Sequence, residues 1–425
     1  LVTTAPHFAA TDLSGMIAAQ VTSGVSVLRA PGPPRGSLAR RCTCRPPHPG
    51  RAAPRRCNRL QVAACSGHKD DMAPLDVDEI SFVPLHANFG VRVEGVDLSR
   101  PRTPAAEACL RDAISKHDLL LFPQQQLTPE QELRAYEMFP HDAEAVAQGS
   151  FVQKLGPKLP TVPAIAVRGH NVSLEDHFGL TTDKPLTYAP NFRDTLVWHQ
   201  DAVGLTETPP EVSGMYMLEC PQSTEPPSSI LPSGKTTSEM VSAGEFTGGE
   251  TWFASMAHCY AALSEEQQQR ADELKCSYAR ATFLFASMAA NGVGRTDDID
   301  DALAKVKADP RLSALVGSDV TTPLVERDQE TDTRHLLISP NTFYTFESEG
   351  EEMPSAAARA ELESLLVPYL EDPANVFRLS WQPNDLAIWR NRRLLHTSTP
   401  WAQYTQERRL FHLMFLDSDR PILAP

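Results

Sequence analysis

The residues best suited to chemistry in this sequence lie in the short run Trp198-His199-Gln200-Asp201. The apolar residues before this run favour the end of a strand, on which His199 and Asp201 would project from one face and Gln200 from the other. An imidazole and a carboxylate on one face are two of the three ligands of a 2-His-1-carboxylate triad, which binds Fe(II) and leaves coordination sites open. The same spacing recurs in His68-Lys69-Asp70 without a strand pattern, so a third ligand must support the interpretation.

The C-terminal part of the chain offers that ligand and a group that could bind an anion. His396 follows the run Arg390-Asn391-Arg392-Arg393 and lies in an apolar segment. Taken alone it is more typical of a hydrogen-bonded core histidine than of a ligand. Arg408 and Arg409 are neighbours on a predicted terminal strand, so they point to opposite faces and only one of them can enter the interior. A buried arginine needs an acidic partner, which a bound dicarboxylate would supply.

Length and composition indicate a folded protein. The chain has 425 residues, of which 41% are hydrophobic, so a sizeable core is expected. A formal charge of -15 argues against a nucleic-acid partner. The absence of any 18-residue apolar run argues against a membrane span. The eight cysteines follow no zinc-binding spacing, and those in the body of the chain are expected to be reduced thiols.

The N-terminal region differs in composition from the rest. Residues 1–64 contain nine arginines and a single acid, Asp12, which is typical of an organelle transit peptide. We therefore expect the chloroplast stroma, with the mitochondrion or cytoplasm as alternatives; a disordered basic tail is the competing interpretation. Residues 65–78 are predicted to be a linker and residues 79–422 a single domain. Within it, residues 222–245 are rich in Ser, Thr, Pro and Gly and form either a surface loop or retained intron sequence.

The body of the chain alternates short apolar strands with a few helices. Strands are predicted over 80–85, 90–98, 119–122 and 212–219, and helices after Thr103-Pro104 and Thr128-Pro129, over 265–274 and over 355–370. Residues 140–190 are predicted to be loops, with His141, His170 and His177 as ordinary loop residues. This pattern predicts a mainly β (α+β) fold with peripheral helices, a double-stranded β-helix or jelly roll.

Two further predictions concern packing within these elements. Leu379-Ser380-Trp381 and the strand at 386–389 flank the turn at 382–385, and we expect them to form a hairpin. The apolar faces of two helices are expected to include Ala105 and Cys109 in the first and Ala356 in the last.

Several motifs together resemble the taurine/2,4-D dioxygenase family of Fe(II)- and 2-oxoglutarate-dependent oxygenases. They are, in chain order, Gly95-Val96-Asp97-Leu98, Trp198-His199-x-Asp201, Gly248-Gly249-x-Thr251, Trp381-Gln382-Pro383-Asn384-Asp385, Asn391-Arg392, His396 and Arg408-Arg409. The resemblance covers roughly residues 78–422.

The resemblance implies a site and a reaction. His199, Asp201 and His396 would bind Fe(II) as the catalytic centre, and Thr251 and Arg409 would hold the distal carboxylate of 2-oxoglutarate. O2 would be the oxidant of a small-molecule substrate. Arg409 is preferred to Arg408 because its position matches the family's terminal arginine.

The sequence departs from the family at one informative position. Members that use a sulfonate carry a second arginine four residues after the first, where this chain has Leu413. Taurine is therefore not expected to be the substrate.

Two other classes of function stay open at this point. One is a non-catalytic jelly-roll binding or regulatory protein that has kept the fold. The other is a zinc hydrolase with the same three ligands, although zinc favours thiols or three histidines. The sequence is also compatible with a homo-oligomer.

Overall fold

The computed structural model describes residues 73–139, 156–186, 197–221, 249–278, 308, 320–399, 407–417 and 420–425. The predicted transit peptide at 1–64, most of the predicted linker and the segment at 222–245 lie outside these ranges and stay predictions. Within them, no helix combines the length and the apolar composition that crossing a membrane requires.

The largest sheet in the described ranges has seven strands in the order β1-β2-β3-β14-β5-β16-β4. Its strands are β1 (Ser81–Pro84), β2 (Val91–Glu94), β3 (Leu119–Phe122), β4 (Ala166–His170), β5 (Val212–Glu219), β14 (Leu386–Arg390) and β16 (Arg409–Leu416). All neighbours are antiparallel except β2 and β3. The four central strands β3, β14, β5 and β16 are almost wholly buried, as expected for a sheet covered on both faces.

A smaller sheet, in the order β13-β6-β15, covers the inner face of the large one. It consists of β13 (Val376–Leu379), β6 (Thr251–Ser255) and β15 (Leu394–Ser398). The ring centroid of Phe253 on β6 lies 5.3 Å from that of Trp389 on β14, and side chains of both sheets form one buried cluster. The two sheets thus pack face to face, as the jelly-roll prediction requires.

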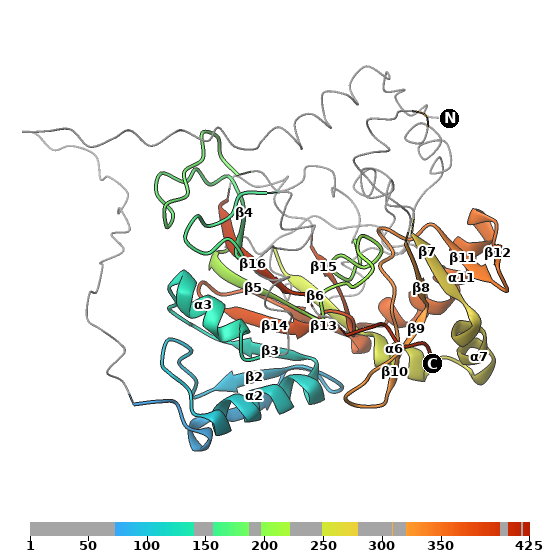
Figure 1. Ribbon diagram of the computed structural model, residues 1–425, viewed down its shortest axis with the longest axis horizontal. Coiled ribbons are helices and arrows are strands. Elements are labelled where there is room, and N and C mark those ends of the chain that lie inside the picture. The colour runs from blue at the N-terminus through green and yellow to red at the C-terminus, as the bar shows by residue number, and fades with distance from the viewer. Residues whose placement is uncertain are drawn as a thin grey trace, which may run out of the picture.

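Further strands extend the molecule on one side. These are β7 (Lys275–Tyr278), β8 (Val320–Pro323), β9 (Val325–Arg327), β10 (Arg334–Leu336), β11 (Thr345–Ser348) and β12 (Glu351–Glu352). Helices α6 (Met256–Ala262), α7 (Glu265–Glu273) and α11 (Ser355–Leu370) belong to the same part of the molecule, and two 3-10 turns occur at Val77–Glu79 and Pro373–Asn375. Figure 1 shows α7, α11, β11 and β12 together, on the side away from α2 and α3.

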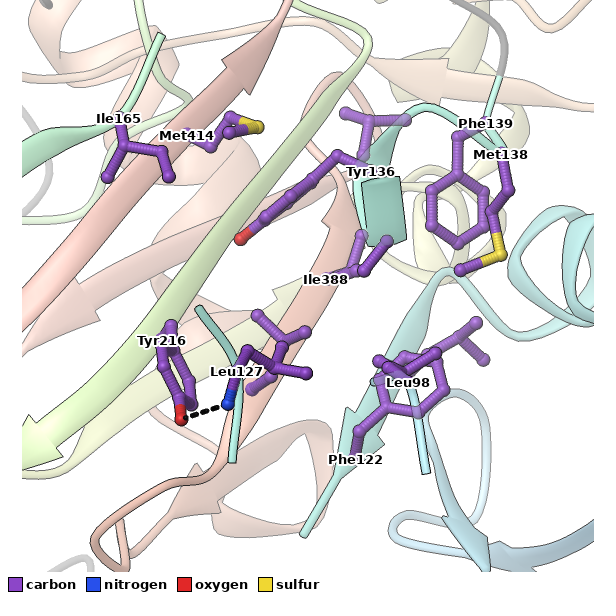
Figure 2. Packing of buried hydrophobic residues seen from close by; sticks show 14 of the residues in the cluster. Leu98, Phe122, Leu127, Tyr136, Met138, Phe139, Ile165, Tyr216, Ile388 and Met414 are labelled. Atoms are coloured by element: carbon purple, nitrogen blue, oxygen red, sulfur yellow. Dashed lines mark hydrogen bonds between the residues drawn. The ribbon is translucent and has the colours of Figure 1, made fainter. Parts of the chain in front are cut away.

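Helices α2 (Pro104–His117) and α3 (Pro129–Tyr136) cover the outer face of the large sheet. Each begins with a threonine cap followed by proline: Thr103 accepts a hydrogen bond from Ala106 N, and Thr128 forms a capping box with Gln131. Figure 2 shows the core beneath them, where Tyr136 and Tyr216 lie among aliphatic side chains.

Some local predictions were wrong for reasons of packing. The segments around the turn at 382–385 do not form a hairpin, because β13 pairs with β6 in the small sheet and β14 pairs with β3 and β5 in the large one. Residues 166–170, predicted to be loop, form strand β4 against β16. Ala105 and Ala356 are exposed, and Cys109 is half-buried, since the buried stripes of α2 and α11 begin instead at Ala106 and Ala358.

Candidate metal centre

His199 and His396 come from segments far apart in the sequence and meet through their backbones. Each donates its amide N–H to the other's carbonyl oxygen at 2.9 Å, which makes an antiparallel bridge. The predicted strand is reduced here to this single bridge, because the chain turns at Asp201. Side chains directly opposite in such a pair are close, and the two imidazole centroids lie 4.2 Å apart.

The turn brings the Asp201 carboxylate to the two imidazoles. Its oxygens lie 3.7 Å from His199 Nε2 and 3.6 Å from His396 Nε2, and one ligand atom from each residue falls within 4.8 Å of the others. These distances are too long for hydrogen bonds, yet close to the ~3 Å that separates atoms bound at about 2.1 Å to one metal ion. In the described part of the chain, the buried Asp201 Oδ2 has no hydrogen-bond partner. The donor set and this oxygen fit a divalent metal.

The protonation states also suit a metal. His199 Nδ1 lies 2.8 Å from the carbonyl oxygen of Val197, so Nδ1 carries the proton and the Nε2 lone pair is directed at the site. Burial, together with repulsion by His396, lowers the pKa of His199 to about 4, so it is neutral at physiological pH. Burial alone would raise the pKa of Asp201, but attraction to His396 and His199 holds it below its ordinary value.

An apolar wall of aromatic rings stands behind His396. The Trp389 ring lies 5.1 Å from the imidazole in an edge-on arrangement, and the Phe253 ring lies 6.0 Å away, stacked. Because Phe253 belongs to the small sheet and Trp389 to the large one, the imidazole of His396 is held between the two sheets.

The two adjacent arginines of β16 lie in opposite environments, as their alternation predicts. Arg409 is completely buried, with Nη2 3.9 Å from the sulfur of Met215 and its guanidinium carbon 4.9 Å from the centre of the Phe411 ring. Arg408 is exposed and forms an ion pair of 2.7 Å with Glu219. The interior of the jelly roll therefore receives the positive charge of Arg409 alone from this pair.

Thr251, the first residue of β6, lies in the same interior. It is buried, and its hydroxyl oxygen accepts a hydrogen bond of 2.9 Å from Trp381 Nε1. Trp381, Met215 and Phe411 belong to one hydrophobic cluster, so Thr251 and Arg409 both border that cluster. With its oxygen occupied by the indole, the Thr251 hydroxyl can donate its hydrogen to a bound anion.

Comparison with known proteins decides the family. Residues 81–414 match the model of the family described as "Taurine catabolism dioxygenase TauD, TfdA family". The chain belongs to this family. It is an α-ketoglutarate (2-oxoglutarate)-dependent non-haem iron dioxygenase, in which the His-Asp-His triad binds Fe(II).

The individual relatives are distant. A (S)-phenoxypropionate/alpha-ketoglutarate-dioxygenase of Sphingobium herbicidovorans is 26% identical over 333 residues, covering 77% of this chain and 92% of the relative. The xanthine dioxygenase xan1 of Schizosaccharomyces pombe is 24% identical over 385 residues, covering 81% and 90%. A crystal structure described as a putative alpha-ketoglutarate-dependent taurine dioxygenase from Burkholderia xenovorans superposes with a TM-score of 0.55 at 19% identity, covering 81% and 95%. That similarity confirms the jelly-roll fold.

Sequence reasoning missed the residues that hold the TauD-family triad in place. Gln200 points away from the site as predicted, but its amide bonds Arg392 O at 2.6 Å and Ile338 N at 2.8 Å. Asn391 bonds the backbone of Asp201. The motif positions of both residues were visible in the sequence, but their partners are set by tertiary structure.

Loops at the mouth of a jelly roll commonly bind ligands, which makes residues 188–193 and 341–344 candidates for substrate contacts. Residues 188–193 lie outside the described ranges. In the segment 341–344, Thr342 is buried and donates to Val203 O at 2.9 Å, which supports the turn after the iron ligands.

Proposed function

We propose that this TauD-family enzyme hydroxylates a C–H bond of a small organic substrate while converting 2-oxoglutarate and O2 into succinate and CO2. The observation that carries the proposal is the convergence of His199, Asp201 and His396 on one point inside an apolar layer. Iron bound there supplies the oxidising chemistry. The chain would hold the metal by three ligands and leave its remaining coordination sites for the reactants.

Arg409 and Thr251 are proposed to hold the distal carboxylate of 2-oxoglutarate. A guanidinium is always charged and presents paired N–H donors that match a carboxylate, and Arg409 is the buried member of its pair. The Thr251 hydroxyl, oriented by Trp381, adds a third donor. A neutral pocket would not select a dicarboxylic co-substrate over a monocarboxylic one, whereas this charge does.

Leu413 supports a substrate other than a sulfonate. It lies on β16 on the same alternation as Arg409 and packs against the interior cluster. An apolar side chain cannot pair with an anion. We therefore propose a substrate that carries no charge next to Leu413, or whose charged group is bound by other residues. The distant relatives named for phenoxypropionate and xanthine make aromatic acids and purines the first compounds to screen, and no sulfite release is expected from taurine.

The adjacent arginines provide a matched test of the proposal. Succinate formation from 2-oxoglutarate should be measured with anaerobically reconstituted Fe(II) protein after oxygen is admitted, for the parent, Arg409→Ala and Arg408→Ala. We expect slow turnover without substrate in the parent and in Arg408→Ala. In Arg409→Ala the KM for 2-oxoglutarate should rise at least about 30-fold, because removing one partner of a buried charge pair costs ~2–5 kcal/mol.

Two results would contradict the proposal. Equal effects of the two substitutions would remove Arg409 from the co-substrate site. If the parent formed no succinate with any screened compound and showed no visible absorption band with Fe(II) and 2-oxoglutarate, a non-catalytic binding protein would be the better interpretation.

A further inference from the structure

Asn391 is completely buried in the turn between β14 and β15, and its side chain is bound to the backbone of a metal ligand. Its Oδ1 accepts a hydrogen bond of 2.7 Å from Asp201 N, and its Nδ2 donates to Asp201 O at 2.8 Å and to Pro210 O at 2.9 Å. One amide therefore binds both the N–H and the C=O of Asp201. This arrangement fixes the position and the rotation of that residue's backbone.

Asp201 needs such support because of the local backbone. The paired segment ends at His199, and the next residue after Asp201, Ala202, has a φ of 58°. A non-glycine residue in this left-handed region is strained by roughly 1–2 kcal/mol and is held only by its surroundings. In the described part of the chain, the hydrogen bonds of the Asp201 N–H and C=O both go to Asn391.

The turn that carries Asn391 is itself held firmly. Its three arginines form buried ion pairs: Arg390 with Asp328, Arg392 with Glu326 at 3.2 Å and Arg393 with Asp118 at 2.7 Å. The carbonyl oxygen of Arg392 also accepts the hydrogen bond from Gln200, the residue between the two ligands. The same turn leads directly into β15, which bears His396. One rigid turn thus contacts the segment of His199 and Asp201 and begins the strand of the third ligand.

We propose that Asn391 is a positioning residue that holds the Asp201 carboxylate in the orientation required for binding iron. It does not touch the metal or the reactants. Loss of its amide frees the Asp201 backbone to rotate, so the carboxylate samples orientations that cannot bind. Iron affinity falls as a result, even though all three ligands are present.

Gln125 provides a control whose hydrogen bonds match those of Asn391. It is also buried, its Oε1 accepts from Leu98 N at 2.9 Å, and its Nε2 donates to Val96 O at 2.9 Å and Pro123 O at 3.0 Å. It lies in the outer layer near α3 and makes none of these contacts with the triad. Asn391→Ala and Gln125→Ala therefore remove the same number of backbone hydrogen bonds, one set at the triad and one elsewhere.

The experiment measures metal affinity and stability separately. Each full-length variant is titrated with Mn(II) and Co(II) by calorimetry and absorption, and the apoprotein is unfolded in urea. We expect Asn391→Ala to bind both metals roughly 10–100-fold more weakly, the effect usual for groups that orient metal ligands, with a changed Co(II) spectrum. Gln125→Ala should lose comparable stability but bind metal like the parent.

The proposal is overturned if Asn391→Ala binds metal as tightly as the parent, or if Gln125→Ala weakens binding equally. Should Asn391→Ala fail to fold, the pair Asn391→Ser and Gln125→Ser makes the same comparison with smaller loss of polarity. Because metal binding is measured without substrate, failure here would leave the oxidation proposal standing.

Discussion

Two clusters of two histidines and one carboxylate lie on opposite faces of the large sheet. On the inner face, His199 and His396 approach the Asp201 carboxylate at 3.7 and 3.6 Å. On the outer face, beneath α3, Glu132 Oε2 lies 2.6 Å from His412 Nδ1, and His412 Nε2 lies 2.8 Å from His177 Nε2. The residue types are the same, but the first cluster converges on a point and the second forms a line.

The two clusters differ in which groups hydrogen-bond to the ring nitrogens of their histidines. Both ring nitrogens of His412 are engaged by Glu132 and His177, so no lone pair is available to a metal. In the inner cluster, the carbonyl oxygen of Val197 hydrogen-bonds to Nδ1 of His199, and Nε2 is left for a metal. The hydrogen bonds of the outer cluster link α3, β16 and the segment after β4, whereas the inner cluster has ligand atoms that no described hydrogen bond occupies. Metal binding is thus decided by hydrogen-bond geometry rather than by residue type.

The largest difference is expected when one histidine of each cluster is replaced by alanine and the two variants are compared. His396→Ala should abolish succinate formation and weaken Fe(II) binding by more than the roughly 100-fold that loss of an orienting group can cause, because a ligand itself is removed. His412→Ala should leave iron affinity near that of the parent. Calorimetric titration and succinate assays check both; comparable loss of iron in His412→Ala would show that the clusters are coupled.

The outer cluster should matter instead for stability. His412→Leu leaves the buried Glu132 carboxylate without its partner, which costs about 3–5 kcal/mol of unfolding free energy for a broken buried pair. The double variant Glu132→Leu/His412→Leu should lose less than the sum of the two single variants, because it leaves no buried carboxylate without its histidine partner. Urea unfolding of the four proteins gives this coupling, and strict additivity would mean that the pair contributes nothing.

The sequence was sufficient for features that are encoded locally. The threonine caps of α2 and α3 and the bounds of β5 and α11 follow from nearby residues, and the structure agrees with them. The iron triad was also predictable, because Trp198-His199-x-Asp201 and His396 stand in a recognisable order of motifs.

Features set by distant partners could not be predicted in this way. The turn at 382–385 looks like a hairpin locally, but β13 and β14 find better partners in different sheets. The sequence predicts His177 to be an ordinary loop residue, since nothing near it in the chain indicates its contact with His412. The role of Asn391 likewise depends on Asp201, which is distant in the chain.

A smaller effect should distinguish the clusters by pH. Burial, followed by repulsion from His412, lowers the pKa of His177 to about 4, while nearby Asp176 acts in the opposite direction. A histidine in the unfolded chain takes up its proton near pH 6.5, so between about 6.5 and 4 the unfolded state binds more protons than the folded one. The contribution of His177 to stability is therefore present above this window and is lost as the pH falls through it.

His177→Gln removes this titration and keeps an amide donor for His412. Unfolding free energies of the apoprotein should be measured from pH 7 to 4, and they should fall less steeply in the variant than in the parent. The difference in slope should correspond to the uptake of less than about one proton on unfolding, and the two curves should converge at low pH. Iron affinity at pH 7 should not change, since among the described residues the His177 ring contacts His412 and Phe178 and none of the three iron ligands. An unchanged pH slope would mean that the His177–His412 contact opens without cost, and the outer line would then reduce to the Glu132–His412 pair.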